Sequence, residues 1–139
     1  MAQPGYETLV DRVREVLLSR EPEIVAGYVY GSYARGDSGP QSDLDLAVLL
    51  PPGRRLIDKL ALMAALSRQV HREVDVVNLR EAGLDLIREV LRDGHKLFDR
   101  DKDHTLAWEA ERMTDYSEFN PRRAELLDMY LHDPLRSAL

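Results

Sequence analysis

The chain has 139 residues, the length of one domain, which is enough to bury a hydrophobic core without stapling disulfides. Its net charge of −6 argues against a protein whose main task is to grip a nucleic-acid backbone, so we expect no direct nucleic-acid binding. It contains no cysteine, which excludes disulfides, thiol catalysis and zinc–thiolate sites. No apolar run approaches the roughly 20 residues of a membrane span, and the N-terminus lacks the layout of a signal peptide, so a cytoplasmic location is expected.

The first third of the chain shows one helix pattern followed by two strand patterns. Apolar residues recur at helical spacing from Thr8 to Arg20, and the following Glu21-Pro22 pair ends the helix because a residue before proline avoids the helical region. Strands are predicted at Ile24–Tyr30 and Asp43–Leu50, which are rich in apolar and β-branched residues. The connection between them, where Ser32–Gly36 is predicted as a helical turn capped by Ser32, is long for a hairpin and short for a helical crossover. A connection of that length often carries function.

The rest of the chain alternates further helices and strands. In chain order we predict a helix at Arg54–His71, a strand at Glu73–Leu79, a helix at Leu84–Arg92 ended by Gly94 as a left-handed cap, a short edge strand at 95–100, and helices at Asp103–Glu118 and Pro121–Leu131. This order predicts an α+β fold, a small mixed sheet of three to four strands flanked by helices. We divide the single domain into a core at 1–100 and a C-terminal helical segment at 101–139 that packs on the core or on a partner.

Two acids open the second predicted strand. Residues two apart in a strand point to the same face, so Asp43 and Asp45 place two carboxylates side by side, while Leu44, Leu46 and Val48 face the core. Adjacent like charges repel and cost stability, and a hard divalent cation with oxygen ligands usually offsets that cost. Mg2+ is the expected ion, because it binds through one or two carboxylates plus the phosphates of a substrate.

The Gly31-Ser32 pair supplies a complementary element. Glycine lets a phosphate approach the backbone closely, and the helical turn that follows aims free N–H groups at an anion. The Ser32 hydroxyl adds a donor, and Arg35 in the same turn either contacts phosphate or is a solvated turn residue. The connection therefore combines a phosphate-binding element with a metal-binding element.

A third acid lies in the third predicted strand, in the segment EVDVVNL. Period-2 counting places Asp75 on the face opposite Val74 and Val76, and Glu73 shares that face as the alternative candidate. Three carboxylates suit nucleotidyl transfer, in which one metal ion lowers the pKa of the attacking hydroxyl and another steadies the pyrophosphate. Asp75 is also a candidate general base. The competing interpretation is that Asp75 is an exposed strand residue without a catalytic role.

The segment GSYARGDSGPQSDLDL resembles the signature of the DNA polymerase β-like nucleotidyltransferase superfamily. That signature is Gly-Ser, ten residues and Asp-x-Asp, and ten residues separate Ser32 from Asp43 here. In so short a chain, the form GSYARG…SDLDL looks most like the minimal nucleotidyltransferase (MNT) antitoxins, which pair with a HEPN-family ribonuclease toxin. The resemblance covers nearly the whole chain.

The resemblance implies an antitoxin of a type VII-like pair that transfers AMP from ATP to a tyrosine hydroxyl of the toxin. It implies that Gly31 and Ser32 bind phosphates, that Asp43 and Asp45 hold Mg2+, and that Asp75 is the third carboxylate. Two alternatives remain open. One is a nucleotidyltransferase acting on a small hydroxylated substrate, as antibiotic-modifying enzymes do. The other is an inactive fold that neutralises its partner by binding alone.

Several other side chains are candidates for a role at an interface, in packing or in metal binding. The C-terminal segment is rich in residues favoured at interfaces, although packing on the core is the competing interpretation for each: Trp108, Met113, Tyr116, Phe119, Leu126, Leu127, Met129 and Tyr130. Tyr28 and Tyr30 are predicted to pack within a strand, and Asp99–Asp103 to be a solvated linker or a helix start. The histidines, His71, His95, His104 and His132, lack metal-ligand spacing and are predicted to be surface or cap residues.

Overall fold

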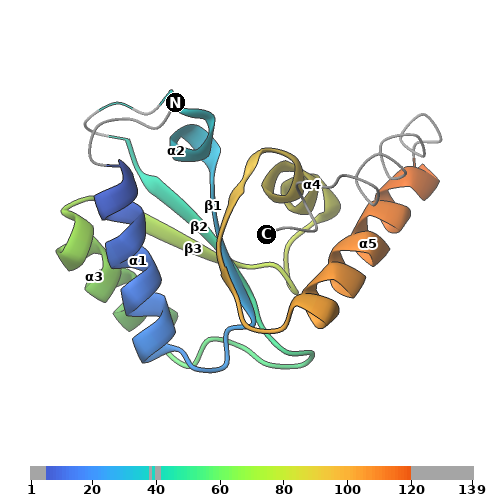
Figure 1. Ribbon diagram of the computed structural model, residues 1–139, viewed down its shortest axis with the longest axis horizontal. Helices are drawn as coiled ribbons and strands as arrows, with labels where there is room; N and C mark the ends of the chain where they lie inside the picture. The colour runs from blue at the N-terminus through green and yellow to red at the C-terminus, as the bar shows by residue number, and fades with distance from the viewer. Residues whose placement is uncertain (1–5, 38, 40–41, 120–139) are drawn as a thin grey trace.

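The structure is a computed structural model, and it describes residues 6–37, 39 and 42–119. Figure 1 shows helices packed on both sides of one sheet. The elements in chain order are α1 (Tyr6–Arg20), β1 (Ala26–Tyr30), α2 (Gly31–Arg35), β2 (Leu44–Leu49), α3 (Lys59–Val70), β3 (Val74–Asn78), α4 (Leu84–Asp93), β4 (His95–Asp99) and α5 (Lys102–Phe119). No helix of the described part is long and apolar enough to cross a membrane.

The four strands form one mixed sheet in the order β3-β2-β1-β4. β1 runs antiparallel to both β2 and β4, while β2 and β3 are parallel. The predicted α+β class with a small mixed sheet is therefore confirmed, including the edge strand, which is β4. Because of these directions, the end of β1 and the beginnings of β2 and β3 lie at the same edge of the sheet, namely the edge that runs across the ends of the strands.

Both faces of the sheet are buried. Figure 1 shows α1 and α3 on one face and α4 and α5 on the other. The first face is covered by a core cluster that includes Val13, Leu17, Leu44, Leu46, Val48, Leu62, Leu66, Val74 and Val76. The second face has its own cluster, which includes Tyr28, Tyr30, Ala47, Leu49, Ile87, Val90, Leu91 and Trp108. The prediction that Leu44, Leu46 and Val48 face the core is confirmed, and the face that carries Asp45 is buried further along the strand as well.

Three predictions about helix ends were wrong. Ser32 does not cap α2, because the helix already begins at Gly31 and its N-cap residue, Tyr30, makes no side-chain cap bond. Gly94 follows α4 with φ −75° and is not left-handed; a side chain there would collide with the Val90 carbonyl oxygen, so crowding explains this glycine. The third helix begins at Lys59 and not at Arg54, because the Asp58 side chain accepts a hydrogen bond from the Ala61 N–H at 3.0 Å and caps it.

Other predictions about individual residues had mixed outcomes. His71 is confirmed as a cap residue, since it ends α3 in the left-handed region with φ 55°. Trp108 is buried in the second cluster and Met113 packs against it, so these two pack on the core, as the competing interpretation held. The predicted helix at Pro121–Leu131 lies outside the described residues.

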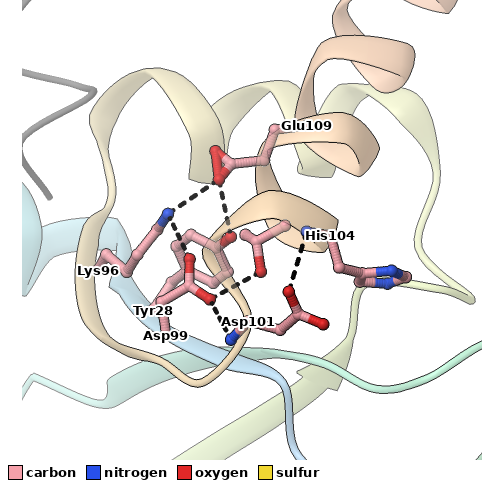
Figure 2. Close-up of polar contacts among 7 residues, drawn as sticks. Tyr28, Lys96, Asp99, Asp101, His104 and Glu109 are labelled. Carbon is pink, nitrogen blue, oxygen red and sulfur yellow. Dashed lines mark hydrogen bonds and ion pairs between the residues drawn. The ribbon is translucent and has the colours of Figure 1, made fainter.

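A buried polar network fastens α5 to the sheet (Figure 2). The Lys96 ammonium lies 3.1 Å from a carboxylate oxygen of Asp99 and 3.0 Å from one of Glu109, and the side chains of the two acids are only 4% and 1% exposed. The Tyr28 hydroxyl donates to Glu109 at 3.3 Å, and the Thr105 hydroxyl donates to Asp99 at 2.9 Å. The prediction of a solvated linker was therefore wrong for Asp99, while the predicted helix start beyond it is confirmed.

Candidate active site

The most constrained contact of the site joins Gly31 to Asp45. Gly31 has φ +71°, a left-handed conformation that side chains rarely adopt. A Cβ atom at this position would collide with Oδ2 of Asp45 and would lie 3.3 Å from its Cγ. The carboxylate of Asp45 therefore rests directly on the first residue of α2, and glycine is required there for two separate reasons.

The three predicted acids gather at the edge where β1 ends. In the sheet register, Asp45 of β2 is paired with Tyr30 of β1 and with Asp75 of β3. Asp75 is exposed, whereas Val74 and Val76 beside it are buried on the opposite face. Asp43 stands one residue before β2 and is exposed. The sheet therefore places Asp75, rather than the alternative Glu73, in the register position beside Asp45.

The electrostatic state of Asp45 reflects this crowding. Burial raises the pKa of the Asp45 carboxyl, and the charges of Asp75, Asp43 and Glu89 raise it further, whereas Arg35 lowers it. Within the described part of the chain, none of the predicted acids forms an ion pair with a basic side chain. The guanidinium of Arg35 is 3.4 Å from Asp37 instead. Residues 6–37, 39 and 42–119 thus offer these acids no ion-pair partner, and only the more distant charge of Arg35 acts on Asp45 in their favour.

This donor set fits a hard divalent cation that has other ligands besides protein. In the described residues, no group of three or more His, Cys, Asp or Glu side chains is arranged to hold a metal ion. Mg2+ is usually bound by one or two carboxylates, with water and substrate phosphates as its remaining ligands. Asp43 and Asp45 are two carboxylates of the required kind at the start of β2, and Asp75 is the register partner of Asp45 in the sheet.

The α2 turn lies on the other side of Asp45. Its first residues have backbone N–H groups without partners inside the helix, as at every helix start. Ser32 is half-buried, and its carbonyl oxygen accepts from the Asp37 N–H at 3.0 Å. The arrangement places backbone donors and a hydroxyl residue on one side of Asp45 and a second carboxylate on the other side.

Two residues near the site were not proposed from the sequence. Tyr30 is register-paired with Asp45, and burial together with the charges of Asp45, Asp75 and Glu89 raises the pKa of its hydroxyl to about 12. Glu89 belongs to α4, which packs against α2 and β1. The strand pattern predicts only packing for Tyr30. No motif marks Glu89, because its position near the site depends on where α4 crosses the sheet.

Comparison with known families agrees with this geometry. The profile of the family described as polymerase beta, nucleotidyltransferase matches residues 14–103, which include every predicted site residue. The chain belongs to this nucleotidyltransferase family. The resemblance stated from the Gly-Ser and Asp-x-Asp motifs is thereby confirmed, and the chain is a nucleotidyltransferase by family.

The similar solved structures include toxin–antitoxin complexes. The protein adenylyltransferase MntA of Shewanella oneidensis strain MR-1 is 26% identical over 118 residues, which span 85% of this chain and 84% of MntA. A crystal structure of a toxin–antitoxin with AMP-PNP has a chain that is 26% identical, with a TM-score of 0.71, covering 86% of this chain and 95% of that one. A structure of the tri-AMPylated S. oneidensis HEPN toxin with its MNT antitoxin has the same fold at 22% identity, with a TM-score of 0.68 over 88% and 96% of the two chains.

Proposed function

We propose that this chain is the antitoxin of a type VII-like toxin–antitoxin pair and acts as a Mg2+-dependent protein adenylyltransferase. It transfers AMP from ATP to a tyrosine hydroxyl of a HEPN-family ribonuclease toxin and so neutralises the toxin. Membership of the nucleotidyltransferase family and similarity to MntA and to the toxin–antitoxin bound to AMP-PNP support this proposal. We also infer a cytoplasmic location, where such a toxin would act.

The observation that carries the proposal is the position of Asp45 between the α2 turn and Asp75. Its carboxylate touches Gly31 on one side and is register-paired with Asp75 on the other. A triphosphate bound to the start of α2 would therefore lie beside the acids. That is the geometry a nucleotidyl transfer needs, because phosphate and metal ligands must meet at one place.

Each residue then has a distinct role. Gly31 and Ser32 bind phosphate oxygens through backbone N–H groups and the hydroxyl, and Arg35 adds a positive charge at the same turn. Asp43 and Asp45 hold Mg2+, with Asp75 as the third carboxylate. The bound metal supplies Lewis-acid stabilisation of the charge that develops on the phosphate oxygens.

The reaction balances without further components. The tyrosine oxygen forms a bond to the α-phosphorus of ATP, and the bond from that phosphorus to the bridging oxygen of the β-phosphate breaks. Pyrophosphate leaves with the bonding electron pair. Asp75 accepts the phenolic proton as general base, provided that the acceptor tyrosine comes within hydrogen-bond reach of it.

Labelled ATP tests the proposal. The partner toxin is incubated with this protein, Mg2+ and ATP labelled either at the α- or at the γ-phosphate. We expect only the α-label to reach the toxin, on tyrosine, and we expect none with Asp43→Asn/Asp45→Asn. Labelling by γ-labelled ATP would indicate phosphoryl transfer instead. Toxin neutralisation without any label, preserved in the double variant, would establish the binding-only alternative.

A further inference from the structure

The end of β1 presents a tyrosine at the acidic edge of the sheet. Tyr30 is the last residue of β1, and its register partner across the antiparallel pair is Asp45. Directly opposite residues in such a pair point to the same face and have neighbouring Cβ atoms. The next residue, Gly31, is in contact with the Asp45 carboxylate. Tyr30 is therefore a neighbour of both the α2 turn and Asp45.

Carboxylates from three elements face this tyrosine. They are Asp45 of β2, which is the register partner of Tyr30, Asp75 of β3 and Glu89 of α4. An ordinary phenol has a pKa of about 10 and is protonated at neutral pH. The Tyr30 hydroxyl is therefore available as a hydrogen-bond donor.

This donor has no protein acceptor within the described residues. The ring is packed in the second core cluster and the residue is 7% exposed. Among the described residues, no group accepts a hydrogen bond from its hydroxyl, and this hydroxyl is not one of the fully buried polar atoms that lack a partner. Tyr28, two residues earlier on the same face, differs, because its hydroxyl donates to the buried Glu109 at 3.3 Å.

A bound nucleotide would bring more negative charge to this edge. The site already contains uncompensated carboxylates, and Arg35, whose charge lowers the pKa of Asp45, is itself paired with Asp37. A neutral hydroxyl is suited to phosphate oxygens in such surroundings, because it stabilises the anion and adds no charge of its own.

We propose that Tyr30 is a nucleotide-contacting residue whose hydroxyl donates a hydrogen bond to the phosphate chain of the bound nucleotide. The inference rests on the proposed function only in its requirement that the site binds a nucleoside triphosphate. It assigns to Tyr30 a role beyond the packing that its strand position predicts.

The experiment compares Tyr30→Phe with Tyr28→Phe in the full chain. Binding of AMP-PNP and of inorganic tripolyphosphate, each with Mg2+, is measured by calorimetry, and thermal unfolding is followed in parallel. We expect Tyr30→Phe to bind both ligands about tenfold more weakly with an unchanged unfolding midpoint, since only a hydrogen bond to a charged group is lost. Tyr28→Phe is expected to bind both ligands normally and to unfold at a lower temperature, because Glu109 loses a donor.

Each other outcome would overturn the inference in a recognisable way. Normal binding by Tyr30→Phe would reduce this residue to a packing role. Weaker binding of AMP-PNP with unchanged tripolyphosphate binding would place the contact on the nucleoside and not on the phosphates. Because both ligands are tested by binding alone, the result does not depend on whether AMP is transferred; a wild-type protein that binds AMP-PNP but labels no toxin would refute only the proposed function.

Discussion

At the scale of single residues, the acids of the site have no ion-pair partner in the part of the chain that the structure describes. Burial is the first cause of the raised pKa of Asp45, and the neighbouring acids add to it. A carboxyl whose pKa is raised on folding stabilises the fold below its unfolded pKa, and that contribution is lost as the pH rises through the folded value. At neutral pH, the ionised Asp45 carboxylate therefore lowers the stability of the metal-free fold, and a bound cation would offset this loss.

Replacing Asp45 by Asn tests this charge balance. We expect Asp45→Asn to raise the stability of the metal-free protein at pH 7 by about 0.5 kcal/mol, a small value because solvent still reaches the group. We also expect Mg2+ to raise the unfolding midpoint of the wild type but not of the variant, and AMP transfer to fall at least about a hundredfold. Glu15→Gln, which removes an exposed acid of α1, is the control and should keep both the Mg2+ shift and the activity. An undiminished Mg2+ shift in Asp45→Asn would contradict this account.

A comparison of Gly31 with Gly53 distinguishes the cost of a left-handed backbone from the effect of contact with the site. Gly31 and Gly53 have similar φ values, +71° and +76°, but a Cβ at Gly53 meets nothing within 4 Å, whereas one at Gly31 meets Asp45. We expect both alanine variants to lose about 1–2 kcal/mol of stability from the left-handed backbone. Only Gly31→Ala should also lose AMP transfer, because it displaces the Asp45 carboxylate. Equal activity of the two variants would show that the contact has no role.

At the scale of elements, the network beneath α5 decides how that helix sits on the sheet. Lys96 of β4 neutralises Asp99 at the end of the same strand and Glu109 of α5 (Figure 2). Burial raises the pKa of Glu109, although Lys96 and Tyr28 act against that rise. A buried pair of this kind adds little net stability, but the loss of one partner leaves a charge without compensation.

Lys96→Met tests how far the stability of the fold depends on the ion pairs of Lys96 with Asp99 and Glu109. At pH 7 we expect a loss of about 3–5 kcal/mol in the free energy of unfolding, measured in urea, because two buried acids lose their cation. The loss should shrink as the pH falls, since protonation of Glu109 in the folded state relieves the variant more than the wild type. Lys102→Met, an exposed position in the first turn of α5, serves as the control. A loss that stays constant with pH would show that Glu109 is not the group left unpaired.

The same scale shows where sequence patterns suffice and where they do not. Period-2 counting places Asp43 and Asp45 on one face, because alternation is a property of a single strand. The pairing of Asp45 with Asp75 depends on β3 lying parallel beside β2, which no local pattern specifies. Asp99 reads as a solvated acid in its charged segment DRDKD, yet its side chain is buried, because Lys96 of the same strand and Thr105 of α5 bind it beneath the helix. Sequence patterns thus predict the elements and the Gly-Ser and Asp-x-Asp motifs. Tertiary packing determines that Asp75, Tyr30 and Glu89 lie near Asp45.

At the scale of the whole molecule, helices cover both faces of the sheet, and the site residues lie at the edge where β1 ends and β2 and β3 begin (Figure 1). Gly31, Asp45 and Asp75 all lie at this edge. The proposed acceptor tyrosine must therefore be presented there by the partner, and docking between the two proteins has to bring its hydroxyl to the acids. The net charge of −6 agrees with an acceptor on a protein partner and offers no basic surface for a nucleic-acid backbone as a whole.

The central claim is that the toxin is neutralised by covalent AMP transfer. Its most direct test is whether the toxin remains inactive as a ribonuclease after the antitoxin has been removed. The toxin is incubated with this protein, ATP and Mg2+, then separated from it under conditions that dissociate the complex and refolded, and its ribonuclease activity is measured. We predict that the toxin remains inactive, and that it recovers activity when Asp43→Asn/Asp45→Asn is used or ATP is omitted. Full recovery after incubation with the wild-type protein and ATP would contradict covalent neutralisation and leave binding as the mechanism.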